Sequence, residues 1–255
     1  MHPFLDPTTS MQAFPIPAPQ FNGASRRVGA GSALNWLQQG WAMFIARPGA
    51  WIAMMVIVIV IYIGLATVPL IGPLAAHLLA PVLAAGMLIA CQKLAHEQEL
   101  AISDLFAGFQ QHTSALLTLG VLTMLAMLAL VVLVMLLAGS GMAGAMIMHS
   151  PLAAGIAFGG VALAGLLWLL LSIPIVMAIW FAPALVVFNA MPPVNALKAS
   201  FNACLKNILV FLVYAPLVMV LCFFATLPVG LGFLVLGPVL AGSVYASYRD
   251  IFLSA

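Results

Sequence analysis

The chain has 255 residues, of which 65% are hydrophobic and only 5% are charged. Soluble globular domains have roughly half apolar and about a quarter charged residues, so this composition excludes a soluble domain and predicts an integral membrane protein. The net charge of +2 and the lack of any Lys- or Arg-rich run argue against a nucleic-acid partner.

The first segment of the chain is rich in proline. Five prolines fall within the first nineteen residues, and each one removes a backbone donor and prevents a regular helix. We therefore predict that residues 1–30 form a disordered, Pro-rich cytoplasmic tail. Residues 31–255 are then expected to form a single transmembrane domain.

Six apolar segments are expected to cross the bilayer. A spanning helix needs about 20 apolar residues, because the hydrocarbon layer is about 30 Å thick and a helix rises about 1.5 Å per residue. Five segments meet this requirement directly: residues 50–70, 74–95, 115–138, 208–227 and 230–252. Residues 155–188 are too many for one upright span and few for two, so we predict one long fourth helix, kinked near Pro174. A seventh span is the alternative.

The charged residues indicate which ends of the spans face the cytoplasm. Every Lys, Arg, Asp and Glu falls in the tails or in the connections after the second and fourth spans. The other connections, near 71–74, 139–154 and 227–230, carry no charge, and we interpret "GSGMAG" at 139–144 as a turn outside the membrane. Because Lys and Arg are retained on the cytoplasmic side, we predict a multi-pass protein of the bacterial inner membrane with both termini cytoplasmic.

Three short segments on the predicted cytoplasmic side share one pattern. They are "LNWLQQGWAMFI" from Leu34, "ISDLFAGFQQHT" from Ile102 and "VNALKASFNACL" from Val194. In the first and third segments apolar residues recur at i, i+3, i+7, i+10 and i+11, a spacing that lines one face of a helix. Each segment predicts a short amphipathic helix in the membrane interface, followed by a pair of spans.

Together the short segments and the spans predict a pseudo-threefold parallel repeat, with units at 34–100, 102–190 and 194–255. The middle unit is longer, and we place its insertion at 139–160. We expect Asn, Ser and Asn at the first shared position to cap the short helices. At the last shared position, Pro183 offers an alternative alignment to Pro174 in the middle unit. The shared positions are Asn35, Ser103 and Asn195; Leu37, Leu105 and Leu197; Gly40, Gly108 and Ser200; Trp41, Phe109 and Phe201; and Pro81, Pro174 and Pro238.

Ionisable side chains are almost absent from the predicted spans. Only His77 comes near one, and we interpret it as an interfacial residue close to the outer boundary. Because coupled carriers place costly ionisable groups inside the bundle, this argues against an ion-coupled carrier. Few polar side chains are present to line a water-filled pore.

The most polar segment, residues 93–112, is the best place for a metal site, but its ligands are too few. Only His96 and Glu99 have ligand-like helical spacing, and His112 lies further on. Since zinc sites need three or four protein ligands, a solvated connection is the favoured interpretation. Asp104 has a structural role available in the first turn of a helix, where the helix dipole favours a carboxylate.

Nucleophile and phosphate-binding motifs are also missing from the sequence. Cys91, Cys204 and Cys222 lack CxxC spacing and are interpreted as buried thiols. The sequence predicts no catalytic residue, cofactor or metal. Gly155, Gly159 and Gly160 predict close helix packing within the bundle, with self-association as the alternative.

The residues "LNWLQQGWAMFIARPGAW", "PLIGPLAAHLLAPVLAAGM" and "ISDLFAGF" carry a resemblance. Over about residues 28–253 the chain resembles an uncharacterised family of mainly proteobacterial inner-membrane proteins. The "NALKASF" segment gives a looser likeness to membrane domains fused to glycerophosphodiester phosphodiesterases, whose catalytic domain has no counterpart here. The nearer resemblance implies a fold and a location, and no activity.

Two functions remain open from the sequence. The first is a non-catalytic membrane accessory protein that binds lipids, a protein partner or a second copy of itself. The second is a transporter or permease for an apolar or lipid-like substrate, with prolines as hinges. An enzyme is the least favoured class.

Overall fold

The computed structural model describes residues 21, 23–148 and 151–253, and side-chain surroundings within these ranges except at 137–158. No strand occurs in the described residues, and the prediction of an all-α bundle is confirmed. In chain order the elements are α1 (Ser32–Ala46), α2 (Pro48–Ala66), α3 (Ile71–Ala95), the 3₁₀ helix η1 (Ile102–Phe109), α4 (Thr113–Met148), α5 (Pro151–Trp180), α6 (Ala182–Asn189), α7 (Pro193–Lys206), α8 (Ile208–Thr226), α9 (Phe233–Tyr248) and the π-helical turn η2 (Arg249–Leu253).

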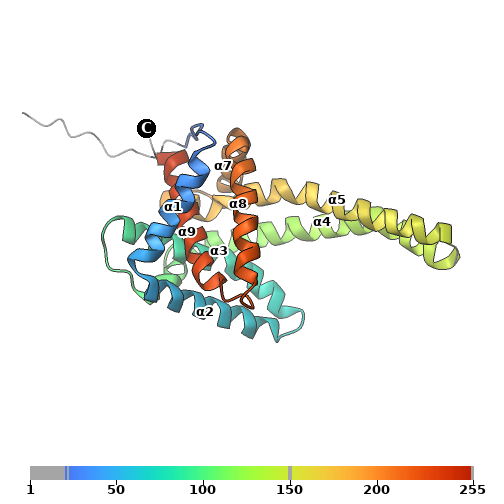
Figure 1. The fold of residues 1–255 in the computed structure, drawn as a ribbon, viewed down its shortest axis with the longest axis horizontal. Coiled ribbons are helices and arrows are strands. Elements are labelled where there is room, and N and C mark those ends of the chain that lie inside the picture. Colours follow the sequence, from blue (N-terminus) through green and yellow to red (C-terminus); the bar gives the residue numbers. More distant parts are fainter. Residues whose placement is uncertain (1–20, 22, 149–150, 254–255) are drawn as a thin grey trace, which may run out of the picture.

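The elements fall into three successive groups, each a short helix followed by a helical hairpin (Figure 1). The short helix α1 precedes the α2–α3 hairpin, η1 precedes the α4–α5 hairpin, and α7 precedes the α8–α9 hairpin. The α4–α5 hairpin projects from the rest of the molecule, as the green and yellow ribbons show (Figure 1). This order of elements is the one expected from the three amphipathic segments.

Five helical stretches in the described part of the chain are long and apolar enough to cross a membrane: 48–66, 71–95, 113–136, 159–189 and 208–226. The sixth predicted span, 230–252, is represented by α9, which has 16 residues and begins at Phe233. The chain turns between α8 and α9 through residues that include Pro228 and Gly230, and the latter has φ +81°. These residues delay the start of α9, which η2 then continues to Leu253.

The helix break in the long fourth span lies at Phe181, which rules out a break at Pro174, whereas a bend at Pro174 stays a prediction. The helix α5 passes through Pro174. The hydroxyl of Ser200 in α7 accepts a hydrogen bond from the Phe181 N–H (2.9 Å) and donates one to the Met177 carbonyl (2.7 Å). A continuous α-helix would join these two backbone groups directly. Insertion of a side chain into this ladder explains why the helix ends here.

Residues 139–144 are helical, so the prediction of a turn at this position is wrong. The helix α4 continues to Met148, and α5 begins at Pro151. The run from 139 to 148 contains three glycines but no proline, and its Ala and Met residues favour helix, so the glycines do not end α4. With 36 and 30 residues, α4 and α5 are longer than the helices of the other two hairpins.

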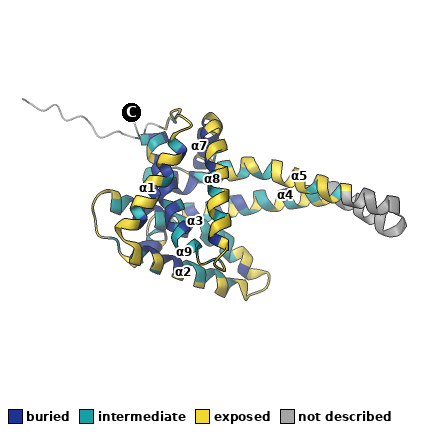
Figure 2. Cartoon of the chain, in the orientation of Figure 1, coloured by how far each residue is buried: buried dark blue, intermediate teal, exposed yellow. Residues whose placement is uncertain are grey.

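Buried residues gather where the short helices meet the hairpins (Figure 2). The largest fully buried ones include Trp36 of α1, Trp51 of α2, Leu105 of η1 and Tyr248 of α9. Away from this core the hairpins expose apolar side chains, and none of the residues in the most apolar window of α5 is buried. The molecule therefore has one packed base and three hairpins whose apolar surfaces suit contact with lipid.

Candidate functional site

Each short helix packs against the second helix of another group. The helix α1 lies against α9, η1 against α3, and α7 against α5 and α6. The first group is therefore joined to the last, and the three groups close into a ring of contacts.

The small residues at the third shared repeat position make these contacts. A Cβ atom on Gly40 would lie 2.1 Å from the carbonyl oxygen of Val239 in α9. A Cβ atom on Gly108 would lie 2.2 Å from the carbonyl oxygen of Val82 in α3. In α7 the same position is Ser200, whose hydroxyl enters the break in the α5–α6 run. At Gly40 and Gly108 a small residue is required because two backbones touch there.

Of the three prolines at the last shared repeat position, Pro81 and Pro238 have equivalent surroundings and Pro174 does not. Pro81 and Pro238 are buried, and each stands directly before the valine whose carbonyl the short helix touches. Pro174 is exposed, and the carbonyl that Ser200 contacts belongs to Met177. The equivalence of all three units stays a prediction.

The predicted helix caps are wrong. The residues that precede the three short helices are Gly31, Ala101 and Pro192, and none has a side-chain cap. Asn35, Ser103 and Asn195 lie inside the helices and are exposed, because each helix begins earlier than expected. In η1 the capping role belongs to Asp104, whose Oδ2 accepts a hydrogen bond from the Ala101 N–H at 3.0 Å.

The apolar repeat positions have unequal environments. Leu105 is fully buried, whereas Leu37 and Leu197 are partly buried. Phe109 is exposed and Phe201 is partly buried. Trp41, in α1, is 49% exposed and, with Leu37, lines the cavity described next.

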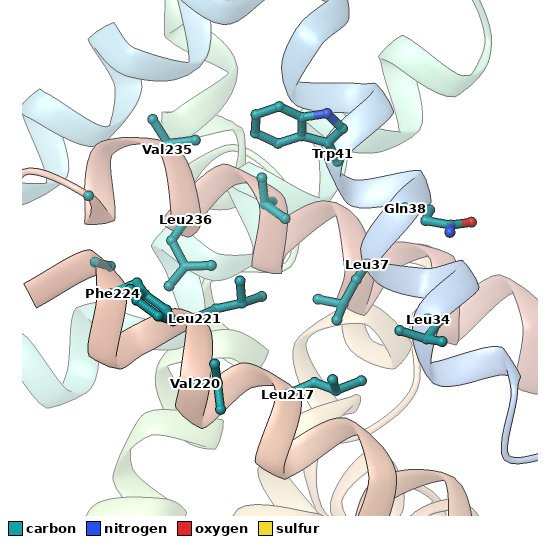
Figure 3. A pocket seen from close by; sticks show the side chains of 13 residues that line it. Leu34, Leu37, Gln38, Trp41, Leu217, Val220, Leu221, Phe224, Val235 and Leu236 are labelled. Carbon is teal, nitrogen blue, oxygen red and sulfur yellow. The ribbon is translucent and has the colours of Figure 1, made fainter.

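An apolar groove with a volume of about 610 Å³ lies between α1, α8 and α9. Side chains of α1 and α8 stand on opposite sides, and α9 lies between them (Figure 3). The volume falls within the roughly 300–1,000 Å³ typical of ligand sites. The lining residues are Leu34, Leu37, Gln38 and Trp41 of α1; Leu217, Val220, Leu221, Phe224 and Ala225 of α8; and Gly232, Val235, Leu236 and Val239 in or beside α9.

The chemistry of the groove is almost wholly that of hydrocarbon. Gln38 carries the single side-chain amide among the lining residues, and no lining residue is charged. From Leu34 to Trp41 the α1 wall extends roughly 10 Å at about 1.5 Å per residue. Such walls can hold part of an alkyl chain through dispersion contacts, but they hold no acid, base or nucleophile for catalysis.

The polar segment 93–112 forms a structural ion pair. The Lys93 ammonium lies 2.6 Å from the carboxylate of Asp104, which is 5% exposed. His96 Nδ1 lies 2.8 Å from the Gln92 carbonyl of its own helix. In the part of the chain that the structure describes, no three His, Cys, Asp or Glu residues are grouped to hold a metal ion.

His77 and the three cysteines lie among packed helices. Thr123 of α4 lies 3.4 Å from His77 Nε2 of α3, so this histidine links two helices. Cys91 and Cys204 are buried, and Cys222 is partly buried. Burial raises the pKa of Cys204 in α7 to about 12, which keeps its thiol protonated and poorly nucleophilic.

The sequence did not identify the groove, although part of its signal was visible. Leu34, Leu37 and Trp41 share one helical face, which the sequence predicts as the apolar side of an interfacial helix. In the structure it forms one wall of a cavity. The other walls lie in α8 and α9, and nothing in their uniformly apolar sequence distinguishes groove residues from lipid-facing ones.

The chain is similar to a probable inner membrane protein of Burkholderia thailandensis. The two are 29% identical over 234 residues, which cover 86% of this chain and 82% of that protein. No family model matches the chain, and no solved structure matches it. The matches do not support the looser likeness to phosphodiesterase-associated membrane domains. With its five candidate spans, the chain is an integral membrane protein.

Proposed function

We propose that this chain is a non-catalytic accessory protein of the inner membrane that binds one acyl chain of a membrane lipid in the α1–α8–α9 groove. The observation that carries the proposal is the groove itself, with its apolar walls and single amide. The similarity to a probable inner membrane protein supports the location.

The groove opens among lipid chains, so a lipid chain is the ligand most available to it. In a bilayer the alternative to binding is an equally apolar hydrocarbon environment, so burial of apolar surface gives little driving force. Binding must come from a fixed shape that a chain fits with more contacts than it finds among other lipids. Of the two walls, α1 is held at close range to α9 through Gly40 and Gly242, which provides such a fixed shape.

Mass spectrometry of the full chain in native nanodiscs tests the proposal. The variant Leu221→Trp fills the groove, and the matched control Leu212→Trp places the same ring on α8 at a residue that is 62% exposed and does not line it. We expect co-purified lipid to fall severalfold for Leu221→Trp and to stay unchanged for the control. Equal lipid content in all three proteins, or no lipid above an unrelated membrane protein, contradicts the proposal. A stoichiometric protein in its place supports a partner-binding accessory role.

A permease for an apolar substrate is the second candidate. Pro81, Pro216 and Pro238 lie inside α3, α8 and α9, and each removes a helical hydrogen bond where a hinge could form. Flux of a labelled lipid in proteoliposomes, slowed by Pro81→Ala, Pro216→Ala or Pro238→Ala, would favour this candidate over the accessory role.

A further inference from the structure

The segment from residue 23 to 31, here called the strap, lies against the C-terminal end of the chain. The backbone N–H of Arg26 donates to the Ile251 carbonyl at 2.9 Å. The Arg26 guanidinium pairs with the carboxylate of Asp250. Just before the strap, the ring of Phe21 packs against that of Phe252, with 6.0 Å between the ring centroids. These contacts join the two ends of the chain although 224 positions separate Arg26 from Asp250.

A buried side-chain amide at the start of α8 hydrogen-bonds to the backbone of the same strap. Asn207 is 3% exposed. Its Oδ1 accepts a hydrogen bond from the Val28 N–H at 2.9 Å, and its Nδ2 donates to the Arg26 carbonyl at 3.0 Å. A second donation, to the Ala203 carbonyl at 2.9 Å, satisfies the remaining donor. A buried amide satisfied in this way fixes the strap to the junction of α7 and α8.

The carboxylate that holds the strap also holds the α1 wall of the groove. Asp250 Oδ2 accepts a hydrogen bond from Trp36 Nε1 at 3.0 Å. Trp36 is 1% exposed and packs on the rings of Phe211 and Tyr214 in α8, at centroid distances of 5.9 and 6.0 Å. Trp36 therefore links Asp250 to both helices that form the groove walls, α1 and α8.

We propose that the strap, Asp250 and Asn207 form a clasp that holds α1 against α8, and that release of the strap lets α1 move and opens the groove to lipid exchange. This inference rests on the proposed lipid-binding function. Leu37 and Trp41, which line the groove, follow Trp36 on the same helix, so a movement of α1 at Trp36 changes the groove directly.

Two readouts on the full chain in nanodiscs test the clasp. Spin labels at Gln39→Cys in α1 and Leu212→Cys in α8, with Cys222→Ala and the buried Cys91 and Cys204 retained, report the distance between the walls. Exchange of a fluorescent phospholipid reports access to the groove. We expect one distance in the parent protein, a second and longer distance in Asn207→Ala and Asp250→Ala, and severalfold faster exchange in both.

The matched variants separate the clasp from general loosening. Asn202→Ala removes an exposed amide from α7 and should leave both readouts unchanged. Asp250→Asn keeps an acceptor for Trp36 but loses the charge that pairs with Arg26, so its effect should be smaller than that of Asp250→Ala. An unchanged single distance and unchanged exchange in Asn207→Ala and Asp250→Ala overturn the clasp.

Salt provides a test that needs no destabilising variant. The Arg26 and Asp250 side chains are 43% and 25% exposed, so added salt should screen their attraction. Exchange should accelerate with salt in the parent protein and stay flat in Arg26→Gln; a flat response in both contradicts the clasp. If the parent protein holds no lipid, the proposed function fails, while the wall distances still decide whether the clasp exists.

Discussion

Glycines occur both where α1 packs against α9 and in the part of α5 around residues 159–160. The first set is packed against backbone atoms of a neighbouring helix, whereas the second set faces open space. Gly40 touches the backbone of α9, and a Cβ on Gly242 would lie 2.8 Å from the Gly40 Cα. Gly159 and Gly160 have no heavy atom within 4 Å of a Cβ among the described residues. The prediction that this part of α5 packs closely within the bundle is wrong for these two glycines, and Gly155 lies where side-chain surroundings are not described.

The difference shows that glycine in a membrane helix permits close packing without causing it. Lipid tails are as apolar as the side chains they replace, so helices associate only where shapes fit or hydrogen bonds form. The α1–α9 contact has a partner of matching shape, and the exposed face of α5 has lipid or a second copy of the chain available to it. Four pairs of substitutions compare the packed base with the exposed surfaces.

The largest difference is expected between Gly40→Leu and Gly159→Leu. The first forces a side chain into a backbone that lies 2.1 Å from its Cβ, and we expect it to lower the free energy of unfolding by about 3 kcal/mol or to prevent folding. The second enters open space and should have little effect. Unfolding in mixed micelles followed by circular dichroism measures both, and equal effects would contradict the α1–α9 contact.

Leu185→Ala and Leu163→Ala compare the same truncation at a buried position and at an exposed one. Leu185 of α6 is 0% exposed, whereas Leu163 of α5 is 58% exposed. We expect the first to lower the free energy of unfolding by about 2 kcal/mol because a cavity remains in the packed base. The second should change it by less than about 0.5 kcal/mol. A larger effect at Leu163 in the same unfolding assay would indicate that a partner covers α5.

Ser200→Ala and Ser172→Ala compare two hydroxyls near the fourth span. Loss of the Ser200 hydroxyl leaves the Phe181 N–H and the Met177 carbonyl without their partner, and we expect a loss of about 1–2 kcal/mol. Among the described residues the Ser172 hydroxyl bonds to the Leu169 carbonyl, one turn earlier in the same helix, so its removal should be nearly silent. Melting temperatures in one detergent check this pair, and equal values would show that the break at Phe181 does not depend on Ser200.

The smallest effect is expected for Thr123→Val, compared with Thr118→Val. Thr123 reaches His77 across two helices at the long distance of 3.4 Å, and such interhelical bonds average about 0.6 kcal/mol. Thr118 bonds within α4 to the Ser114 carbonyl. A change above about 2 kcal/mol at Thr123 would mean that His77 has a role beyond this contact.

Local sequence signals predicted the elements well where composition decides them. The three amphipathic segments, the helical hairpins that follow them and the all-α bundle are all present. The errors came from side chains that act across the fold. Pro174 lies inside α5, and the backbone groups at the Phe181 break bond to Ser200, which is nineteen positions further along the chain.

The sequence by itself determined that the chain belongs in a membrane and is helical, because 65% apolar composition and helix-length apolar runs leave few other stable states. The ring of contacts between the groups, the groove and the strap were decided only by the tertiary structure. Each depends on residues that are distant in sequence, such as Gly40 with Val239 and Arg26 with Asp250. Because the spans are nearly uniform in hydrophobicity, helices pack together where their surfaces are complementary in shape. That complementarity cannot be read from the hydrophobic pattern of a single sequence.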